Sequence, residues 1–350
     1  MRWDQGRPFD EHPGVENLRR LRKPTSRATD RLRREPPPAV LATDDHRYAV
    51  AMAGPEGRRR AQGHALASAS TPCHRQSKVS EGGHAVIKLY DSAFSPFARK
   101  VRMILEHKGL NFEAVDGLLK SNHEALKAVN SRIEVPVLVD NDLVIVNSAD
   151  IVSYLEFRYP TKPAYPEAPA ARVHARAWER AADTLVDAIL SDISYWKWAD
   201  RQDSMPEGLL QAARADLRLV YDALEKDLAQ REFVSGPLSI ADIALFPHLA
   251  SVRAMEVEFA AHEHPNLVRW FKQMRALPIC AADLRRAREF VVSLKDRNVE
   301  RQRIFWRGDR IEWMLARGFH DWFFREIQEH RVLWPGPTLP GSMEPYPSVL

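Results

Sequence analysis

The sequence predicts an α/β domain followed by an all-α domain, with a disordered leader before them and a helical extension after them. Three observations support this organisation. Residues 85–160 alternate between strand-like and helix-like patterns, residues 161–170 belong to a Pro-rich stretch, and residues 171–292 contain helical patterns only. A chain of 350 residues is long enough for two domains that each have a core.

Residues 1–84 form the predicted leader. They carry 16 Lys and Arg against 10 Asp and Glu, a charge of +6, whereas the rest of the chain carries 35 against 37, a charge of −2. The leader has eight prolines, one phenylalanine and no isoleucine. Such a segment buries too little apolar surface to offset its ordering entropy, so we expect disorder. A solvated tail, or a start of translation nearer the core, explains it better than nucleic-acid binding, which would add interleaved aromatics.

Several classes of protein do not fit this sequence. No apolar run approaches the ~18–20 residues that a membrane span requires. The N-terminus is rich in Arg but also acidic, which fits neither a secretory signal nor a transit peptide. Cys73 and Cys280 form no disulfide framework, metal spacing or CxxC pair. We therefore expect a cytoplasmic protein that uses no metal and does not bind membranes.

The elements of the α/β domain follow the order β-α-β-α-β-β-α. The first helix begins at Ser95-Pro96, a favoured pairing at a helix start, and Gly109 stands where a helix should stop. Asn141-Asp142 lies between two apolar runs and predicts a hairpin. The expected strands are 85–90, 111–117, 135–140 and 143–146, and the expected helices are 95–109, 121–130 and 148–159.

The all-α domain opens after a segment with four prolines, which we interpret as a stiff linker. Ser239 and Asp242 have the spacing of a capping box, and we assign this motif to folding rather than to chemistry. The expected helices cover about 171–199, 206–229, 239–253, 265–277 and 281–292.

Residues 293–350 form an aromatic-rich extension. Apolar side chains repeat in it at helical spacing, and we expect this stripe to pack on the body of the protein or across a dimer interface rather than on a membrane. The stripe contains Ile311, Met314, Leu315, Phe319, Trp322, Phe323 and Ile327. Four of the nine tryptophans lie here: Trp306, Trp313, Trp322 and Trp334.

Several motifs together resemble the soluble, cytosolic-type glutathione S-transferase family. They are the strand followed by SPFARKVR, then EVPVLVD, VNSADIVSYL, a Pro-rich linker and LSIADIALFP. The resemblance covers about residues 85–292. Within the family, the chain is similar to Ser-type, bacterial-like members, and it has extensions at both ends. It implies a thioredoxin-like N-terminal domain, an all-α C-terminal domain and a homodimer. It also implies an interdomain cleft that binds glutathione as cosubstrate.

Ser95 is the candidate catalytic residue. Locally it is explained as a helix cap, but the resemblance implies that the residue at this position contacts the glutathione sulfur. The two roles are compatible, because a hydroxyl can accept from the helix amide and donate to a thiolate. Ser92 is a second, less favoured candidate for the same role. Ala98 stands three residues after Ser95, so there is no protein dithiol here, which disfavours disulfide reductase chemistry.

The free energy needed to stabilise the glutathione thiolate can be compared with what Ser95 and its helix contribute. Lowering the pKa of a thiol from ~8.5 by about 2 requires about 2.7 kcal/mol in favour of the thiolate. A hydrogen bond to a charged group contributes about 1.5–3 kcal/mol, and a helix N-terminus contributes about 0.3–2 kcal/mol. The dipole alone does not suffice, so the Ser95 hydroxyl should matter beyond its capping role.

Five further residues are expected to hold glutathione. The resemblance implies a cis bond between Val135 and Pro136, which turns the Val135 backbone toward the cleft to pair with glutathione. Ser148 and the free amides behind it would bind the γ-glutamyl carboxylate, although Ser148 is also explained as an N-cap. Asn147 replaces the Glu or Gln usual in the family and keeps only a hydrogen bond to the ligand. Lys120 is either a solvated lysine or a partner of the glycyl carboxylate.

Other side chains near the cleft are less well defined by the sequence. Arg99, Lys100 and Arg102 are expected to face solvent. The electrophile would contact Ala93, Phe94 and the aromatic cluster at 195–198, although aromatics at such spacing more often belong to a core.

The sequence thus predicts a glutathione transferase that forms a thiolate and directs it at a small apolar electrophile. A non-catalytic binding protein of the same fold is an alternative, motivated by Asn147 and the aromatic extension. Glutathione-dependent isomerisation, dehalogenation or peroxide reduction would use the same site, and the fold does not choose among them.

Overall fold

The computed structural model describes residues 86–198, 204–293, 304–305 and 307–333. The predicted leader, Trp306, and the tail from Trp334 onward lie outside these ranges. The strands are β1 (Ile87–Asp91), β2 (Phe112–Asp116), β3 (Val137–Asp140), β4 (Leu143–Val146), β5 (Ile304–Phe305) and β6 (Val332–Leu333). The helices of the first domain are α2 (Pro96–Lys108), η2 (Lys120–Asn122), α3 (His123–Val129) and α4 (Ser148–Arg158). Those that follow are α5 (Pro169–Ala181), η3 (Ala182–Val186), α6 (Asp187–Trp198), α7 (Leu209–Leu228), α8 (Ile240–Leu249), α9 (Pro265–Ala276), α10 (Pro278–Ser293), α11 (Gly308–Ala316) and α12 (His320–Gln328).

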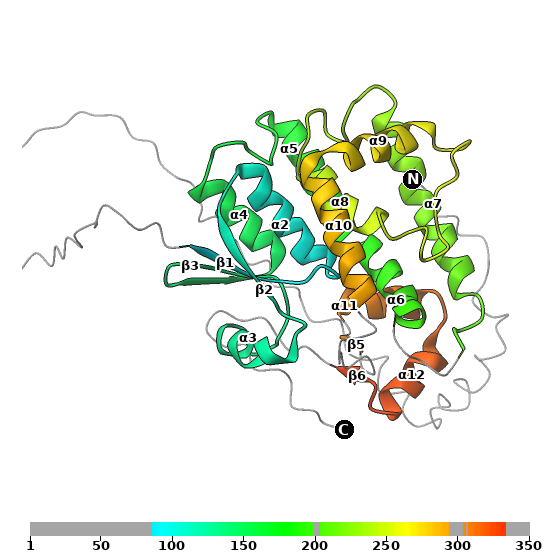
Figure 1. The fold of residues 1–350 in the computed structure, drawn as a ribbon. Coiled ribbons are helices and arrows are strands. Elements are labelled where there is room, and N and C mark those ends of the chain that lie inside the picture. The colour runs from blue at the N-terminus through cyan, green and yellow to red at the C-terminus, as the bar shows by residue number, and fades with distance from the viewer. Residues whose placement is uncertain (1–85, 199–203, 294–303, 306, 334–350) are drawn as a thin grey trace, which may run out of the picture. The chain divides into compact units, whose positions relative to one another are not determined.

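The first domain is a four-stranded sheet in the order β2-β1-β3-β4. β1 is parallel to β2 and antiparallel to β3, which forms a hairpin with β4. Helices α2 and α4 lie on one side of this sheet and α3 on the other (Figure 1). The predicted β-α-β-α-β-β-α order is confirmed, and the sheet brings the end of β1 beside the start of β3.

Helix α2 follows the capping rules that the sequence predicted. Ser95 is its N-cap, Pro96 is its first residue, and Gly109 ends it with a φ of 71°, a left-handed conformation that favours glycine. Ten of its 13 residues are buried. This follows from its position, because one face packs on the sheet and another on α8 and α10.

The second domain is all-helical, as expected. The helix expected over 171–199 is divided into α5, the π-helical segment η3 and α6. The helix expected over 239–253 ends at Leu249. The predicted capping box at its start is present: the Asp242 carboxylate accepts from the Ser239 amide at 3.0 Å.

The Pro-rich segment between the domains is packed rather than free. Ala164 and Tyr165 are buried, and the amides of both donate to the Glu156 carboxylate at 3.0 and 3.4 Å. The Ala164 carbonyl accepts from Ile240 at 2.8 Å. The segment is therefore tied to the last turn of α4 and to the start of α8.

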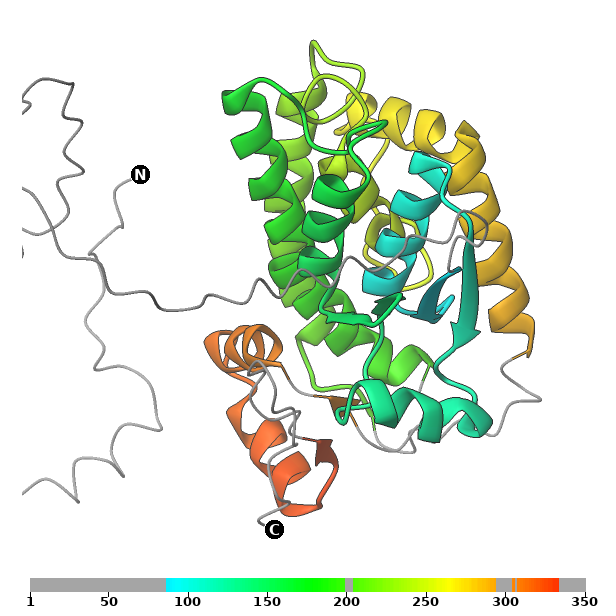
Figure 2. The same cartoon turned by 90° about the vertical axis from the view of Figure 1, so that its left-hand side faces the viewer.

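The apolar stripe of the extension spans two helices instead of one. α11 and α12 are separated at Gly318, whose φ of 86° ends the first helix. Trp313, Met314, Trp322 and Phe323 are buried. The two helices lie against the end of the helical domain near α6 (Figure 2). The expectation that the stripe packs on the body is thus confirmed. Within the described ranges, no helix is long and apolar enough to cross a membrane.

Candidate functional site

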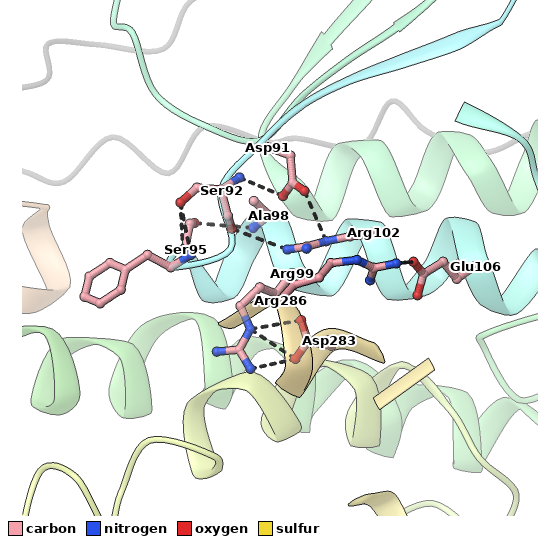
Figure 3. A network of polar contacts seen from close by, with 10 residues as sticks. Asp91, Ser92, Ser95, Ala98, Arg99, Arg102, Glu106, Asp283 and Arg286 are labelled. Carbon is pink, nitrogen blue, oxygen red and sulfur yellow. Dashed lines mark hydrogen bonds and ion pairs between the residues drawn. The ribbon is translucent and has the colours of Figure 1, made fainter. Parts of the chain in front are cut away.

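The loop between β1 and α2 is held in shape by side-chain hydrogen bonds. The Ser92 hydroxyl accepts from the amides of Phe94 and Ser95 at 3.1 and 3.4 Å. The Asp91 carboxylate accepts from the Ser92 amide at 2.7 Å and pairs with Arg102 at 3.1 Å (Figure 3). Ser92 and Asp91 are buried, and burial raises the pKa of the Asp91 carboxyl while Arg102 opposes this rise. This network positions the chain immediately before Ser95.

Ser95 stands at the entrance of α2 and is partly exposed. Its hydroxyl accepts from the Ala98 amide at 3.3 Å, which is the helix-capping bond. Among the described residues, this hydroxyl donates no hydrogen bond. Its proton is therefore available to an acceptor in the space that Ser95 faces, while capping continues.

That space is a cavity of about 1240 Å³ between the two domains. Ser95 and Val135 line it, and so do Ala93, Phe94 and Tyr195, three of the side chains expected to contact an electrophile. Trp196 packs on Trp322 instead, with ring centroids 5.1 Å apart, and the side chain of Trp198 lies outside the described part of the chain. The cavity has room for glutathione and a second small molecule.

The other residues expected to hold glutathione do not line this cavity. The Val135-Pro136 bond is cis, as expected. Asn147, rather than Ser148, is the N-cap of α4: its φ is 73°, and its Oδ1 accepts from the Ala149 amide at 3.4 Å. Ser148 is the first helical residue and is buried. Lys120 begins η2 and is not among the residues that line the cavity.

Three cations of α2 that were expected to face solvent are buried, so that expectation is wrong. Arg99 pairs with Asp283 of α10 at 2.6 Å. Lys100 pairs with Asp183 at 2.5 Å and Glu179 at 3.4 Å. The third cation, Arg102, pairs with Asp91 as described above. Arg99 and Lys100 face the second domain and Arg102 faces the β1–α2 loop, and carboxylates replace water around all three.

His248 of α8 is a cavity residue that the sequence did not single out. It is buried, its ring meets the ring of Phe97 edge-on at 6.0 Å, and burial lowers its pKa to about 4. It is therefore a neutral imidazole at physiological pH. Asp187, Arg307 and Arg310 also line the cavity and were missed. No local pattern marks them, because only the packing of α6 and α11 brings them to this wall.

The described residues contain no group of three or more His, Cys, Asp or Glu side chains placed to hold a metal ion. The cavity wall carries hydroxyls, guanidinium groups, carboxylates, the His248 imidazole and aromatic rings.

Comparison with known proteins agrees with this architecture. The model of the glutathione S-transferase N-terminal domain matches residues 89–163, and that of the C-terminal domain matches residues 207–273. Glutathione S-transferase 1 of Dianthus caryophyllus is 32% identical over 186 residues, covering 50% of this chain and 81% of that protein. This chain belongs to the glutathione S-transferase family.

Solved structures of glutathione S-transferases have the same fold. One from Rhodospirillum rubrum F11 is 26% identical, with a TM-score of 0.51, and covers 57% of this chain and 92% of that chain. Ure2p5 of Phanerochaete chrysosporium was crystallised with 1-(S-glutathionyl)-2,4-dinitrobenzene. This structure is 20% identical, has a TM-score of 0.52, and covers 60% of this chain and 98% of that chain. At this identity the likeness shows the fold alone. The predicted thioredoxin-like domain followed by a helical domain is confirmed. Helices α11 and α12 lie beyond both matched glutathione S-transferase domains.

Proposed function

We propose that this protein is a Ser-type glutathione transferase. It binds reduced glutathione, stabilises its thiolate through Ser95, and directs the sulfur at a small electrophile with an apolar body. A carbon–sulfur bond forms on the electrophile, and either a leaving group departs with its electron pair or, in an addition, a carbon takes up a proton. Ser95 forms no covalent bond, because the nucleophile belongs to the cosubstrate.

The observation that carries this proposal is the position of the Ser95 hydroxyl. It caps α2 with one lone pair, keeps its proton for another acceptor, and faces a cavity large enough for two ligands. A thiolate there would accept a hydrogen bond from the Ser95 hydroxyl and would lie in the favourable field of the helix N-terminus.

The proposed pose of glutathione extends from Ser95 across the sheet. The Val135 backbone would pair with the cysteinyl backbone, since Val135 lines the same cavity as Ser95. Ser148 and the start of α4 would bind the γ-glutamyl carboxylate, Asn147 would accept from the amino group, and Lys120 would bind the glycyl carboxylate.

Titration of glutathione against the protein tests the proposal, followed by the ultraviolet absorbance of the thiolate across pH. Wild type should show a saturable thiolate band with an apparent pKa well below that of free glutathione. Ser95→Ala should abolish the shift, whereas Ser95→Thr, which keeps the hydroxyl and the cap, should retain much of it. A band that persists in Ser95→Ala would reduce Ser95 to a helix cap.

A second candidate function is glutathione binding without catalysis. One observation favours it: the Asn147 Oδ1, expected to contact the ligand, is used to cap its own helix. Binding by calorimetry without a thiolate band would select this alternative. Isomerisation, dehalogenation or peroxide reduction on the same site remain further forms of the enzyme proposal, and turnover of matched substrates separates them.

We propose that the protein is cytoplasmic and acts as a homodimer. Exposed apolar side chains on β4, α4 and α5 support a second copy as partner: Leu143, Val144, Phe157 and Val173. Light scattering should give twice the chain mass, and Phe157→Glu should shift the mass toward that of the monomer.

We further propose the domain boundaries expected from the sequence. They are a leader at 1–84, a glutathione-binding domain at 85–160, a linker at 161–170, an all-α domain at 171–292 and an extension at 293–350. Limited proteolysis followed by mass measurement should cut first before residue 85 and leave the rest intact.

A further inference from the structure

The extension contributes to the wall of the Ser95 cavity. It does so through Arg307 and Arg310, at the start of α11. Both residues lie outside the matched family domains, which end at residue 273. The cavity is therefore partly built by a segment outside the matched family domains.

Helix α11 is fixed to the helical domain by polar contacts to two buried carboxylates. Arg310 donates from Nε and Nη2 to Asp187 of α6 at 3.0 and 2.9 Å. Trp313 donates to Asp216 of α7 at 2.8 Å, and Arg317 donates to the same carboxylate from Nε at 2.7 Å. These contacts hold the start of α11 in place, so the position of Arg307 is defined by the fold.

Arg307 lies beside the residues of the proposed thiolate site. Its guanidinium stacks over the Phe97 ring, 4.8 Å from the centroid, and Phe97 follows Ser95 by two residues. Its Nη2 is 3.7 Å from Glu134, the neighbour of Val135. That carboxylate also pairs with Arg132, at 2.9 Å. The Glu134 contact of Arg307 is thus long and shared, and about a third of the Arg307 side chain is exposed.

The charge of the cavity wall is positive. Three carboxylates line it: Glu134, Asp187 and Glu258. Six arginines line it: Arg99, Arg253, Arg275, Arg288, Arg307 and Arg310. The buried pairs of Arg99 with Asp283 and of Arg310 with Asp187 occupy two of them. The cavity wall also includes apolar and aromatic side chains, among them Phe94, Phe97, Leu190 and Tyr195.

We propose that Arg307 binds a carboxylate on the electrophilic cosubstrate, so that the preferred electrophile is an apolar or aromatic acid. The aromatic wall holds the body of the molecule, and the stacked guanidinium presents its donors to the anionic group in the fork geometry that suits carboxylates. The inference rests on the proposed function, and it identifies the extension as the part of the chain that sets substrate preference.

A matched pair of electrophiles tests this assignment. 4-Chloro-3,5-dinitrobenzoate and its methyl ester share the reacting carbon and the leaving group and differ in charge. Wild type should favour the acid in kcat/KM after each is corrected for its uncatalysed rate with glutathione. Arg307→Gln should raise KM for the acid on the order of tenfold. It should leave KM for the ester and for glutathione unchanged, and Arg307→Lys should recover part of the loss.

Arg285→Gln is the control for net charge. Arg285 is exposed on α10 and does not line the cavity, so the variant should behave as wild type. A rise in KM for glutathione instead of the acid in Arg307→Gln would assign Arg307 to a carboxylate of glutathione and overturn the proposal. An equal loss for acid and ester would also overturn it, by showing a structural role.

A binding measurement separates this inference from the proposed function. 3,5-Dinitrobenzoate lacks the leaving group, so calorimetry reports its affinity whether or not the protein forms a thiolate. Weaker binding to Arg307→Gln than to wild type, with Arg285→Gln unchanged, supports the carboxylate site even if the Ser95 titration fails. Equal binding to all three proteins overturns it even if Ser95 activates glutathione.

Discussion

Arg99 and Asp283 join the two domains through a buried, multiply bonded ion pair. Arg99 donates from Nη2 to Asp283 at 2.6 Å and from Nε to both carboxylate oxygens at 3.1 Å (Figure 3). The Arg99 amide also donates to the Ser95 carbonyl at 3.0 Å. The first turn of α2, which carries the proposed catalytic residue, is therefore anchored to α10 in the other domain.

Asp283→Ala should lower the free energy of unfolding by about 3–5 kcal/mol, because it leaves the Arg99 charge buried without its partner. Arg286→Gln is the matched control one turn along α10. Its pair with Glu106 is 2.5 Å long, but the Arg286 side chain is 40% exposed, so the loss should be about 0–1 kcal/mol. Urea unfolding of both variants checks this, and equal losses would contradict a structural role for the buried pair.

Gly117→Ala should disturb the proposed glutathione site through packing. A Cβ at Gly117 would overlap a methyl group of Val135 and lie 3.3 Å from Leu126. Overpacking of this kind costs about 1–3 kcal/mol, and we expect weaker glutathione binding because Val135 must move. Gly308→Ala is the control, since among the described residues, its chain neighbours aside, no heavy atom lies within 4 Å of an added Cβ. Calorimetry measures the affinity of both variants for glutathione. An unchanged affinity in Gly117→Ala would argue against the proposed role of Val135 in binding glutathione.

His248 should make the protein less stable in acid. Burial lowers the pKa of His248 from an ordinary value of 6.5 to about 4. Between these values the unfolded chain binds a proton that the folded protein does not, so stability falls as pH drops below about 6.5. The full loss is about 3 kcal/mol, reached near pH 4. His248→Gln should flatten this part of the stability profile, whereas replacement of the exposed His262 should leave it unchanged.

Asp192 should have the opposite effect on stability. It is buried in α6, neither carboxyl oxygen has a hydrogen-bond partner among the described residues, and burial raises its pKa well above the usual range. The folded protein keeps this proton where the unfolded chain has lost it, so stability falls as pH rises above the ordinary Asp pKa. Asp192→Asn should therefore raise the melting temperature more at pH 8 than at pH 5. The exposed Asp142 provides the control, and an equal gain at both pH values would contradict a raised pKa.

The sequence by itself determined the local structure of this protein. Capping residues, prolines and apolar periods fix where helices and strands begin and end, because these signals act within one turn or one hairpin. Ser95 with Pro96, Ser239 with Asp242, and the hairpin at Asn141-Asp142 were all readable in this way. The two-domain architecture followed from their order and from the resemblance to the family.

Tertiary structure decided which polar groups share an environment. Arg99 and Lys100 were predicted to face solvent because their partners lie 184, 79 and 83 positions away, beyond any local pattern. Gly318 divides a stripe that has the period of one helix, and Asn147 instead of Ser148 caps α4. Arg307 reaches Phe97 and the cavity of Ser95 only because α11 packs on α6. Burial and charge pairing depend on which surfaces meet, and contacts between segments far apart in the chain settle that.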